Sequence, residues 1–167
     1  MYWYIAYVDN DYIDNLVDFF NRQENCLAFI PKMEKWYNVK SIKNYVVRKL
    51  YPNYVLIKSH LDKKEFIFQY NGFFNSLKGS VSLLQYDNTT ALNRGEQAIF
   101  EQLFDNESII RHSIGNIVDS KLIVDQGPLK GLEDLVIKID RHHRIATLKT
   151  NFLGQPIRVA LEVVSKT

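Results

Sequence analysis

The stretch from residue 32 to 49 has the residue types of a nucleic-acid surface. Its single carboxylate, Glu34, is outnumbered by six basic residues, and aromatic residues are interleaved with them: Lys32, Lys35, Lys40, Lys43, Arg48 and Lys49, with Trp36, Tyr37 and Tyr45. Cationic side chains attract phosphate, and aromatic rings stack on nucleobases. The pattern therefore suits contact with nucleic acid, but it fits a second interpretation equally well. The alternative is a solvated hairpin whose lysines protect a strand edge.

A second basic group lies near the C-terminus, on expected turns and strand ends. It consists of Lys130, Lys138, Arg141, His142, His143, Arg144 and Lys149. A basic turn of this kind suits RNA phosphate, so we predict these seven as nucleic-acid-binding residues. The alternative is a polar hairpin turn that binds nothing.

The sequence offers little for catalysis or for metal binding. His142 and His143 have no further His, Cys or paired carboxylates close by in sequence, so we expect no metal. The segment Gly127–Gly131 lacks the Lys-Ser/Thr half of a phosphate-binding loop and is interpreted as a turn. We expect Cys26 to be a core residue, and we expect no cofactor and no enzymatic activity.

Composition limits the class of protein. The 167 residues, 46% of them hydrophobic, are enough for one domain or for one medium and one small domain. The 21 Lys and Arg against 19 Asp and Glu give a net charge of only +2, so any basic site must come from local clustering. One cysteine and no long apolar run predict a cytoplasmic protein without a membrane segment. We also expect a monomer.

The first hundred residues show strand and helix periods in alternation. Aromatic and β-branched residues at 3–8 predict an inner strand, and apolar residues spaced from Ile13 to Phe20 predict a helix from Asp11 to about Glu24. Capping-box spacings predict two more helices, one from Asp62 that ends near Gly72 and one over 93–104. The remaining expected elements are an apolar run at 26–31, a hairpin at 32–49 and a strand at 54–57. This order suggests an α+β sandwich.

Helical signals cease after residue 104. Residues 105–113 are polar without a sustained period and are interpreted as a linker. Short strands follow, separated by Gly, Pro and basic turns, at 121–124, 135–139, 145–148 and 157–161. About 50 residues of short strands predict a small barrel, because so small a sheet must curl to hide its edges.

Several segments resemble one known family in order and spacing. Residues 3–7 (WYIAY), 25–31 (NCLAFIP) and 50–57 (LYPNYVLI) resemble the N-terminal domain of NusG transcription factors. Residues 124–133 (VDQGPLKGLE) resemble its KOW motif. Pro52-Asn53-Tyr54, in place of the usual Pro-Gly-Tyr, is similar to specialised paralogues typified by RfaH. Residues 138–144 (KIDRHHR), with 127–131, are similar to the LoaP branch.

The resemblance implies a ferredoxin-like α/β domain at 1–104, a linker at 105–113 and an SH3-like β-barrel KOW domain at 114–167. It also implies that the first domain binds the clamp helices of the largest subunit of bacterial RNA polymerase, suppresses pausing and promotes antitermination. The implied partners of the KOW domain are nascent RNA, a ribosomal protein or another factor.

By the same resemblance, Tyr7, Tyr51, Tyr54 and Leu56 are the expected polymerase-binding residues. Alternation along the strand puts Tyr54 and Leu56 on one face and Val55 and Ile57 on the other. From the alternation alone, either face could be the one that packs in the core. Asp11, Asp14 and Asp18 make the first helix acidic, which disfavours DNA reading by that helix. The His-Thr-Thr-Thr segment by which RfaH touches the second large polymerase subunit is absent near the second helix.

Two other hypotheses remain open. The first is a housekeeping elongation factor of the same family, which the Pro52-Asn53 pair disfavours. The second is a free-standing RNA-binding or ribosome-associated KOW protein, in which the first domain is only a scaffold. The many β-branched residues of the C-terminal strands also predict a stable barrel there, in place of a segment that refolds as in RfaH.

Overall fold

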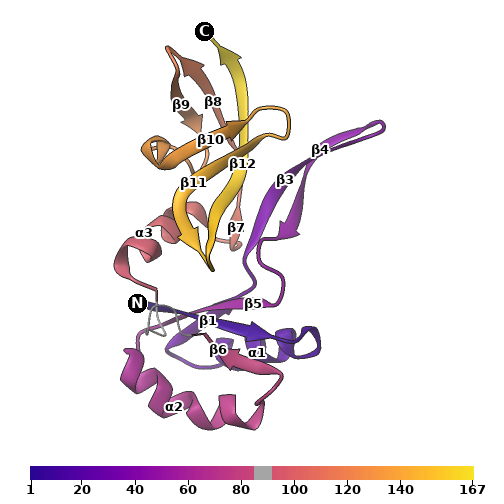
Figure 1. Ribbon diagram of the computed structural model, residues 1–167. Coiled ribbons are helices and arrows are strands. Elements are labelled where there is room, and N and C mark those ends of the chain that lie inside the picture. Colours follow the sequence, from indigo (N-terminus) through magenta and orange to yellow (C-terminus); the bar gives the residue numbers. More distant parts are fainter. Residues whose placement is uncertain (85–91) are drawn as a thin grey trace. The chain divides into compact units, whose positions relative to one another are not determined.

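The computed structural model describes residues 1–84 and 92–167, and it divides into two compact units. The first unit consists of residues 1–31 and 51–98, and the second of residues 32–50 and 99–167. The division falls within helix α3 (Arg94–Leu103) (Figure 1). The hairpin that follows Pro31 thus belongs to the same compact unit as the C-terminal strands, although it is an insertion between strands of the first unit.

The first unit contains a four-stranded antiparallel sheet in the order β2-β5-β1-β6. Its strands are β1 (Tyr2–Val8), β2 (Cys26–Phe29), β5 (Tyr54–Ser59) and β6 (Val81–Leu83). The apolar residues of β1 and β5 place these strands at the centre, where both faces are shielded from water. The prediction that the first strand is an inner strand is confirmed.

Two helices cover one face of this sheet (Figure 1). They are α1 (Ile13–Asn21), preceded by the 3-10 turn η1 (Asn10–Tyr12), and α2 (Lys63–Ser76). Tyr4 of β1 stacks on Phe66 of α2 with ring centroids 3.9 Å apart, and Phe20 of α1 packs beside both. Each such buried side chain contributes about 1.5–3 kcal/mol to stability.

Both predicted capping boxes are present. The Glu65 backbone N–H donates to the Asp62 carboxylate at 3.0 Å, and the Asp62 N–H donates to the Glu65 carboxylate at 3.1 Å. Asn93 and Glu96 make the same reciprocal pair at 2.9 Å each. These bonds satisfy backbone donors that a helix start leaves without partners, and they fix where α2 and α3 begin.

Helix α2 continues past Gly72 to Ser76, so the prediction that it stops near Gly72 is wrong. The glycine is exposed and costs the helix about 1 kcal/mol. Phe73, one residue later, stacks on Phe19 of α1 with ring centroids 3.9 Å apart, and Phe74 packs near Phe20. This aromatic packing outweighs the local preference of glycine for a helix end.

The second unit begins with a long hairpin formed by β3 (Lys32–Val39) and β4 (Ile42–Lys49), as predicted. Strand β7 (Ile109–Ile110) pairs with β3 in parallel at Lys32 and Met33. The segment 105–113, interpreted above as a linker, therefore contains a short strand. Its turn is ordered by Asp105, whose carboxylate accepts the N–H groups of Glu107 and Ile109.

A five-stranded sheet completes the second unit, in the order β10-β11-β12-β8-β9. Its strands are β8 (Ser113–Val118), β9 (Lys121–Gln126), β10 (Val136–Asp140), β11 (Ile145–Phe152) and β12 (Gln155–Lys166), with the 3-10 turn η2 (Glu133–Leu135) before β10. Strands β12 and β8 pair in parallel, and the other neighbours pair antiparallel. Because β9 and β10 end the order, the strand pairing over residues 113–166 is open and forms no closed barrel.

Gly127 lies at the start of the loop after β9, where its backbone approaches the backbone of Ser113 closely. Its φ is +104°, and a Cβ atom there would lie 2.6 Å from the Cα and the Oγ of Ser113. Ser113 is fully buried, and its Oγ accepts the Leu129 N–H at 3.0 Å. Glycine is therefore required on two counts, the backbone conformation and the close approach of another backbone segment.

We expect Gly127→Ala to destabilise the second unit by about 2–4 kcal/mol, because backbone strain and overpacking each cost about 1–3 kcal/mol. Gly154→Ala is the matched control, since Gly154 has a φ of +75° but nothing within 4 Å of its Cβ position. The control should lose only about 1–2 kcal/mol. Urea unfolding followed by circular dichroism measures both, and equal losses would contradict the steric argument.

Candidate binding surfaces

Two predicted surface tyrosines lie side by side in the first unit. Tyr7 of β1 and Tyr54 of β5 are direct cross-strand partners, with ring centroids 5.5 Å apart in an edge-to-face arrangement. Tyr7 is 39% exposed and Tyr54 is half-buried. Exposed neighbouring aromatic rings supply a large apolar contact area at low entropic cost, which suits a protein interface.

The turn before Tyr54 is held by Asn53, which stands where glycine would be the usual choice. Its φ is +68°, a conformation that Asn tolerates better than other non-glycine residues. The Asn53 side chain donates to the Val8 carbonyl at 3.0 Å, and the Val8 N–H donates to the Asn53 carbonyl at 2.8 Å. The side chain of Asn53 thus ties the turn to the end of β1, next to Tyr7.

Of the other two expected polymerase-binding residues, Leu56 differs from the tyrosines in its exposure and Tyr51 does not. Tyr51 is half-buried, and burial raises the pKa of its hydroxyl above the usual range. Leu56 is fully buried. Residues Val55, Leu56 and Ile57 are all buried because β5 is an inner strand covered on both faces, so alternation does not leave Leu56 on the surface. The expectation that Leu56 belongs to an exposed patch is corrected accordingly.

The surface of α1 is acidic, as the sequence indicates. Asp11, which lies in the turn η1, and Asp14 and Asp18 of α1 are all exposed. Like charge repels phosphate, so this helix does not favour a nucleic-acid ligand.

In the second unit the structure brings the two predicted basic segments together. The Arg144 guanidinium lies over the Trp36 ring, 3.7 Å from its centroid. The same guanidinium is 3.1 Å from the Glu162 carboxylate and donates to the Tyr45 hydroxyl at 3.1 Å. Arg144 is half-buried, so it fastens the hairpin to the C-terminal sheet and is engaged inside the protein. These contacts favour a structural role for Arg144 over the predicted binding of nucleic acid.

Glu34 continues this cluster. Its carboxylate accepts the His112 backbone N–H at 2.7 Å, lies 2.5 Å from the His112 Nδ1 and pairs with Arg111 at 3.3 Å. The His112 ring stacks on Tyr45 with centroids 3.9 Å apart. Burial raises the pKa of Glu34, but the bonds from His112 and Arg111 outweigh burial and hold the pKa below its usual range. Sequence analysis missed these roles of Arg111 and His112, because no periodic pattern surrounds them.

The other six predicted nucleic-acid-binding residues are exposed: Lys130, Lys138, Arg141, His142, His143 and Lys149. Lys130 donates to the Asp125 carbonyl at 3.2 Å, and His143 binds the Asp140 carboxylate through both its backbone N–H and its ring. These three bonds shape the turns that contain the two residues. The pKa of Asp140 is lowered by these bonds to His143.

The loop that contains Lys130 is fixed on both sides. Leu129 is fully buried, and the Gln102 side chain of α3 donates to the carbonyls of Pro128 at 3.2 Å and Lys130 at 2.8 Å. In the same unit, Phe100 of α3 packs edge-to-face on Phe152 of β11. The end of α3 thus holds the 127–131 loop in a defined conformation.

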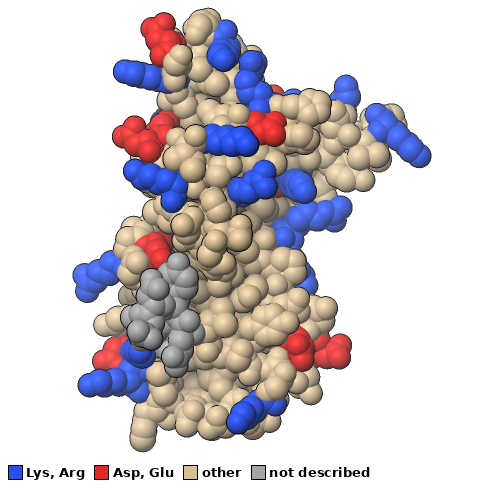
Figure 2. All heavy atoms as spheres, in the orientation of Figure 1, with Lys and Arg blue, Asp and Glu red and all other residues tan. Residues whose placement is uncertain are grey.

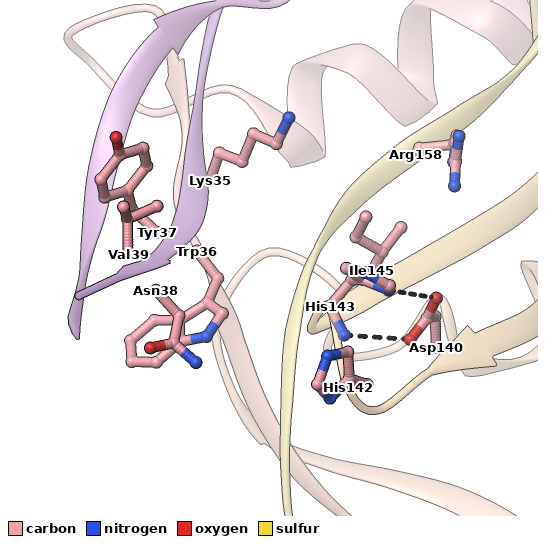
Figure 3. A pocket seen from close by; sticks show the side chains of 10 residues that line it. All are labelled: Lys35, Trp36, Tyr37, Asn38, Val39, Asp140, His142, His143, Ile145 and Arg158. Atoms are coloured by element: carbon pink, nitrogen blue, oxygen red, sulfur yellow. Dashed lines mark hydrogen bonds and ion pairs between the residues drawn. The ribbon is translucent and has the colours of Figure 1, made fainter. Parts of the chain in front are cut away.

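Basic side chains gather along the hairpin. In the view of Figure 2 its outer arm carries Lys and Arg and shows no carboxylate. The part of β3 from Lys35 to Val39, toward the hairpin tip, borders a groove of about 510 Å³ that also includes the β10–β11 turn and β12 (Figure 3). The ten lining residues are Lys35, Trp36, Tyr37, Asn38, Val39, Asp140, His142, His143, Ile145 and Arg158. The groove therefore combines residues of both predicted basic segments.

Over residues 1–84 and 92–167, no group of three or more His, Cys, Asp or Glu side chains is arranged to hold a metal ion. Within the same residues, no helix combines the length and the apolar character that crossing a membrane requires.

Comparison with known families gives one match. The NusG family model, described as "Transcription termination factor nusG", matches residues 1–101, which is more than half of the chain. A search of curated proteins finds no match. The matched region includes the tyrosine pair and the whole basic hairpin.

We expect Glu34→Gln to destabilise the second unit by about 1–2 kcal/mol at neutral pH, because bonds to a charged acceptor are lost. Because the pKa of Glu34 is lowered in the folded state, its carboxylate stabilises the fold at pH values above the unfolded-state pKa, which is about 4.3 for Glu. This stabilisation is lost as the pH falls through the folded-state pKa. The variant should therefore lose less stability than wild type on acidification through this range.

Glu107→Gln is the control for this experiment. Glu107 also pairs with Arg111, but its side chain is 72% exposed, so we expect a change below about 0.5 kcal/mol. Urea unfolding at a series of pH values measures both variants. An unchanged pH dependence in Glu34→Gln would contradict the role given to this carboxylate.

Proposed function

The chain belongs to the NusG family of transcription elongation and termination factors, which are not enzymes and generally bind RNA polymerase; from this premise we propose that it is a specialised member that promotes antitermination. The observation that carries the proposal is the edge-to-face pair of Tyr7, which is exposed, and Tyr54, which is half-buried. We propose that this pair, flanked by Tyr51, binds the clamp helices of the largest polymerase subunit.

The tyrosine pair suits this partner physically. An interface of this type needs an aromatic centre that loses water on binding, within a polar rim. The hydroxyl groups allow the rings to remain exposed in the free protein, and the hydrogen bonds of Asn53 keep the adjacent turn in place. Leu56 supports the patch from the core and does not touch the partner.

Binding alone would not change transcription. A factor that prefers the closed, processive polymerase shifts the population away from the paused state, and the size of the shift is limited by that preference. Pausing and termination compete with elongation, so a ligand of this kind suppresses both. No chemical step by the factor is required.

For residues 114–167 we propose a KOW domain with an SH3-like strand order. The support is the parallel pairing of the last strand, β12, with the first, β8, together with the fixed loop at 127–131. We propose that this domain contacts nascent RNA through Lys138, Arg141 and His142, with Lys130, His143 and Lys149 at the margin. A ribosomal protein or another factor is a further candidate partner.

Specialisation is proposed on the basis of Asn53. Its side chain makes a bond to β1 that glycine cannot make, so the turn beside the tyrosine pair is more firmly held than a Pro-Gly-Tyr turn would be. The second candidate function is an RNA-binding or ribosome-associated KOW protein that does not bind polymerase. It is favoured by the exposed basic turn at 141–143.

Terminator read-through in a purified bacterial transcription system tests the proposal. We expect wild-type protein to raise read-through and Tyr54→Ala to reduce polymerase affinity by about 30-fold, the effect of losing an interface residue worth about 2 kcal/mol. Tyr2→Ala is the control, because Tyr2 is an exposed tyrosine of the same sheet that lies at the other end of β1, opposite Ser59 of β5. Templates with and without a candidate leader RNA show whether the factor is specialised.

Unchanged read-through and polymerase affinity in Tyr54→Ala would contradict the assigned clamp-helix surface. Absence of any effect of the wild type on polymerase, together with tight RNA binding, would favour the second candidate function.

A further inference from the structure

The groove of the second unit runs along a strand edge that, among the described residues, has no partner strand for most of its length. Strand β3 pairs with β4 on one side, and on the other side it pairs with β7 only at Lys32 and Met33. From Lys35 to Val39 this edge borders the groove. Side chains alternate between the two faces of a strand, so a groove along the edge is lined by residues from both faces of β3. The opposite wall comes from the β10–β11 turn and from Arg158 of β12 (Figure 3).

The charges in the groove favour an anionic ligand. Lys35 extends from one wall and Arg158 from the other, and neither makes an ion pair with any residue in the described parts of the chain. Asp140 is the single carboxylate among the lining residues, and it is bound by the His143 backbone N–H at 3.0 Å and by the His143 ring at 2.8 Å. Two cations are thus available to phosphate, while the carboxylate is already satisfied.

Aromatic surface is available beside these cations. The Tyr37 side chain is 39% exposed. The Trp36 ring is held in place by the Arg144 guanidinium on one face, and the His142 ring is exposed and lies edge-to-face with His143. Fixed aromatic rings next to cations suit single-stranded nucleic acid, whose unpaired bases stack while its phosphates bind the cations.

We propose that this groove binds an unpaired segment of single-stranded nucleic acid, with Lys35 and Arg158 contacting phosphates and Tyr37 stacking on a base. The inference deepens the proposed function, because it makes the hairpin and the C-terminal turn one composite site. It does not depend on the tyrosine pair of the first unit. An extended peptide at the edge of β3 is the competing occupant, and the free cations make it the poorer fit.

Fluorescence anisotropy of the full chain with a labelled oligouridine of about twelve nucleotides, a length within the usual range for one binding site, tests the proposal. We expect Tyr37→Ala to weaken binding by about 5- to 150-fold, the range for loss of one stacked base. Lys35→Gln and Arg158→Gln should each lower the slope of log affinity against log salt by about 0.7. An oligothymidine and a duplex of the same length show whether RNA or DNA is preferred and whether the strand must be unpaired.

Matched controls separate the groove from general attraction. Lys121→Gln and Lys166→Gln remove exposed lysines of the same unit that do not line the groove, and Tyr2→Ala removes a tyrosine of similar exposure elsewhere. These three variants should bind like wild type. Equal losses in the lysine controls and the groove variants, or preference for the duplex, would overturn the proposal, as would wild-type binding by all three groove variants.

NMR chemical shifts keep the result interpretable if one variant fails to fold. Addition of the oligouridine to wild-type protein should shift the resonances of Tyr37, Trp36 and His142. Shifts confined to Arg141 and Lys149 would overturn the composite groove but leave the proposed RNA contact of the turn intact. Polymerase affinity, measured separately with Tyr54→Ala, reports on the first unit alone.

Discussion

The organisation of the second unit depends on the position of one guanidinium group. Arg144 lies on the indole of Trp36 and is held by Glu162 and the Tyr45 hydroxyl, so one side chain joins the hairpin to the C-terminal sheet. Stacking and ion pairing of this kind require the planar, permanently charged arginine side chain. Both side chains are only partly exposed, so removing Arg144 would leave the Glu162 carboxylate with the Tyr45 hydroxyl as its hydrogen-bond partner and, among the described residues, with no cation beside it.

This attachment decides which basic residues are available to a ligand. Arg144 looks equivalent to Arg141 in the sequence, yet it is committed to contacts inside the protein, whereas Arg141 is exposed. The same attachment brings Lys35 of the hairpin and Arg158 of β12 to one groove. A protein with a net charge of +2 thereby acquires a local concentration of positive charge.

The two units carry surfaces of different chemistry. This division fits a factor that binds two kinds of partner. The first unit presents neutral tyrosines beside an acidic helix, which suits a protein partner. The second presents cations and aromatic rings, which suit a polyanion. Each surface is supported by its own core, so a change in one need not disturb the other.

The sequence by itself determined the elements whose signals are local. The two capping boxes, the hairpin and the inner position of β1 could all be predicted, because neighbouring residues set helix starts and strand periods. The tyrosines of the proposed surface were expected from the family resemblance and not from a local pattern. Only the tertiary structure decided the burial of Leu56, the extension of α2 past Gly72, the open strand order and the binding of Glu34 by His112. These features depend on residues far apart in the chain, and a linear pattern carries no information about which distant side chains will meet.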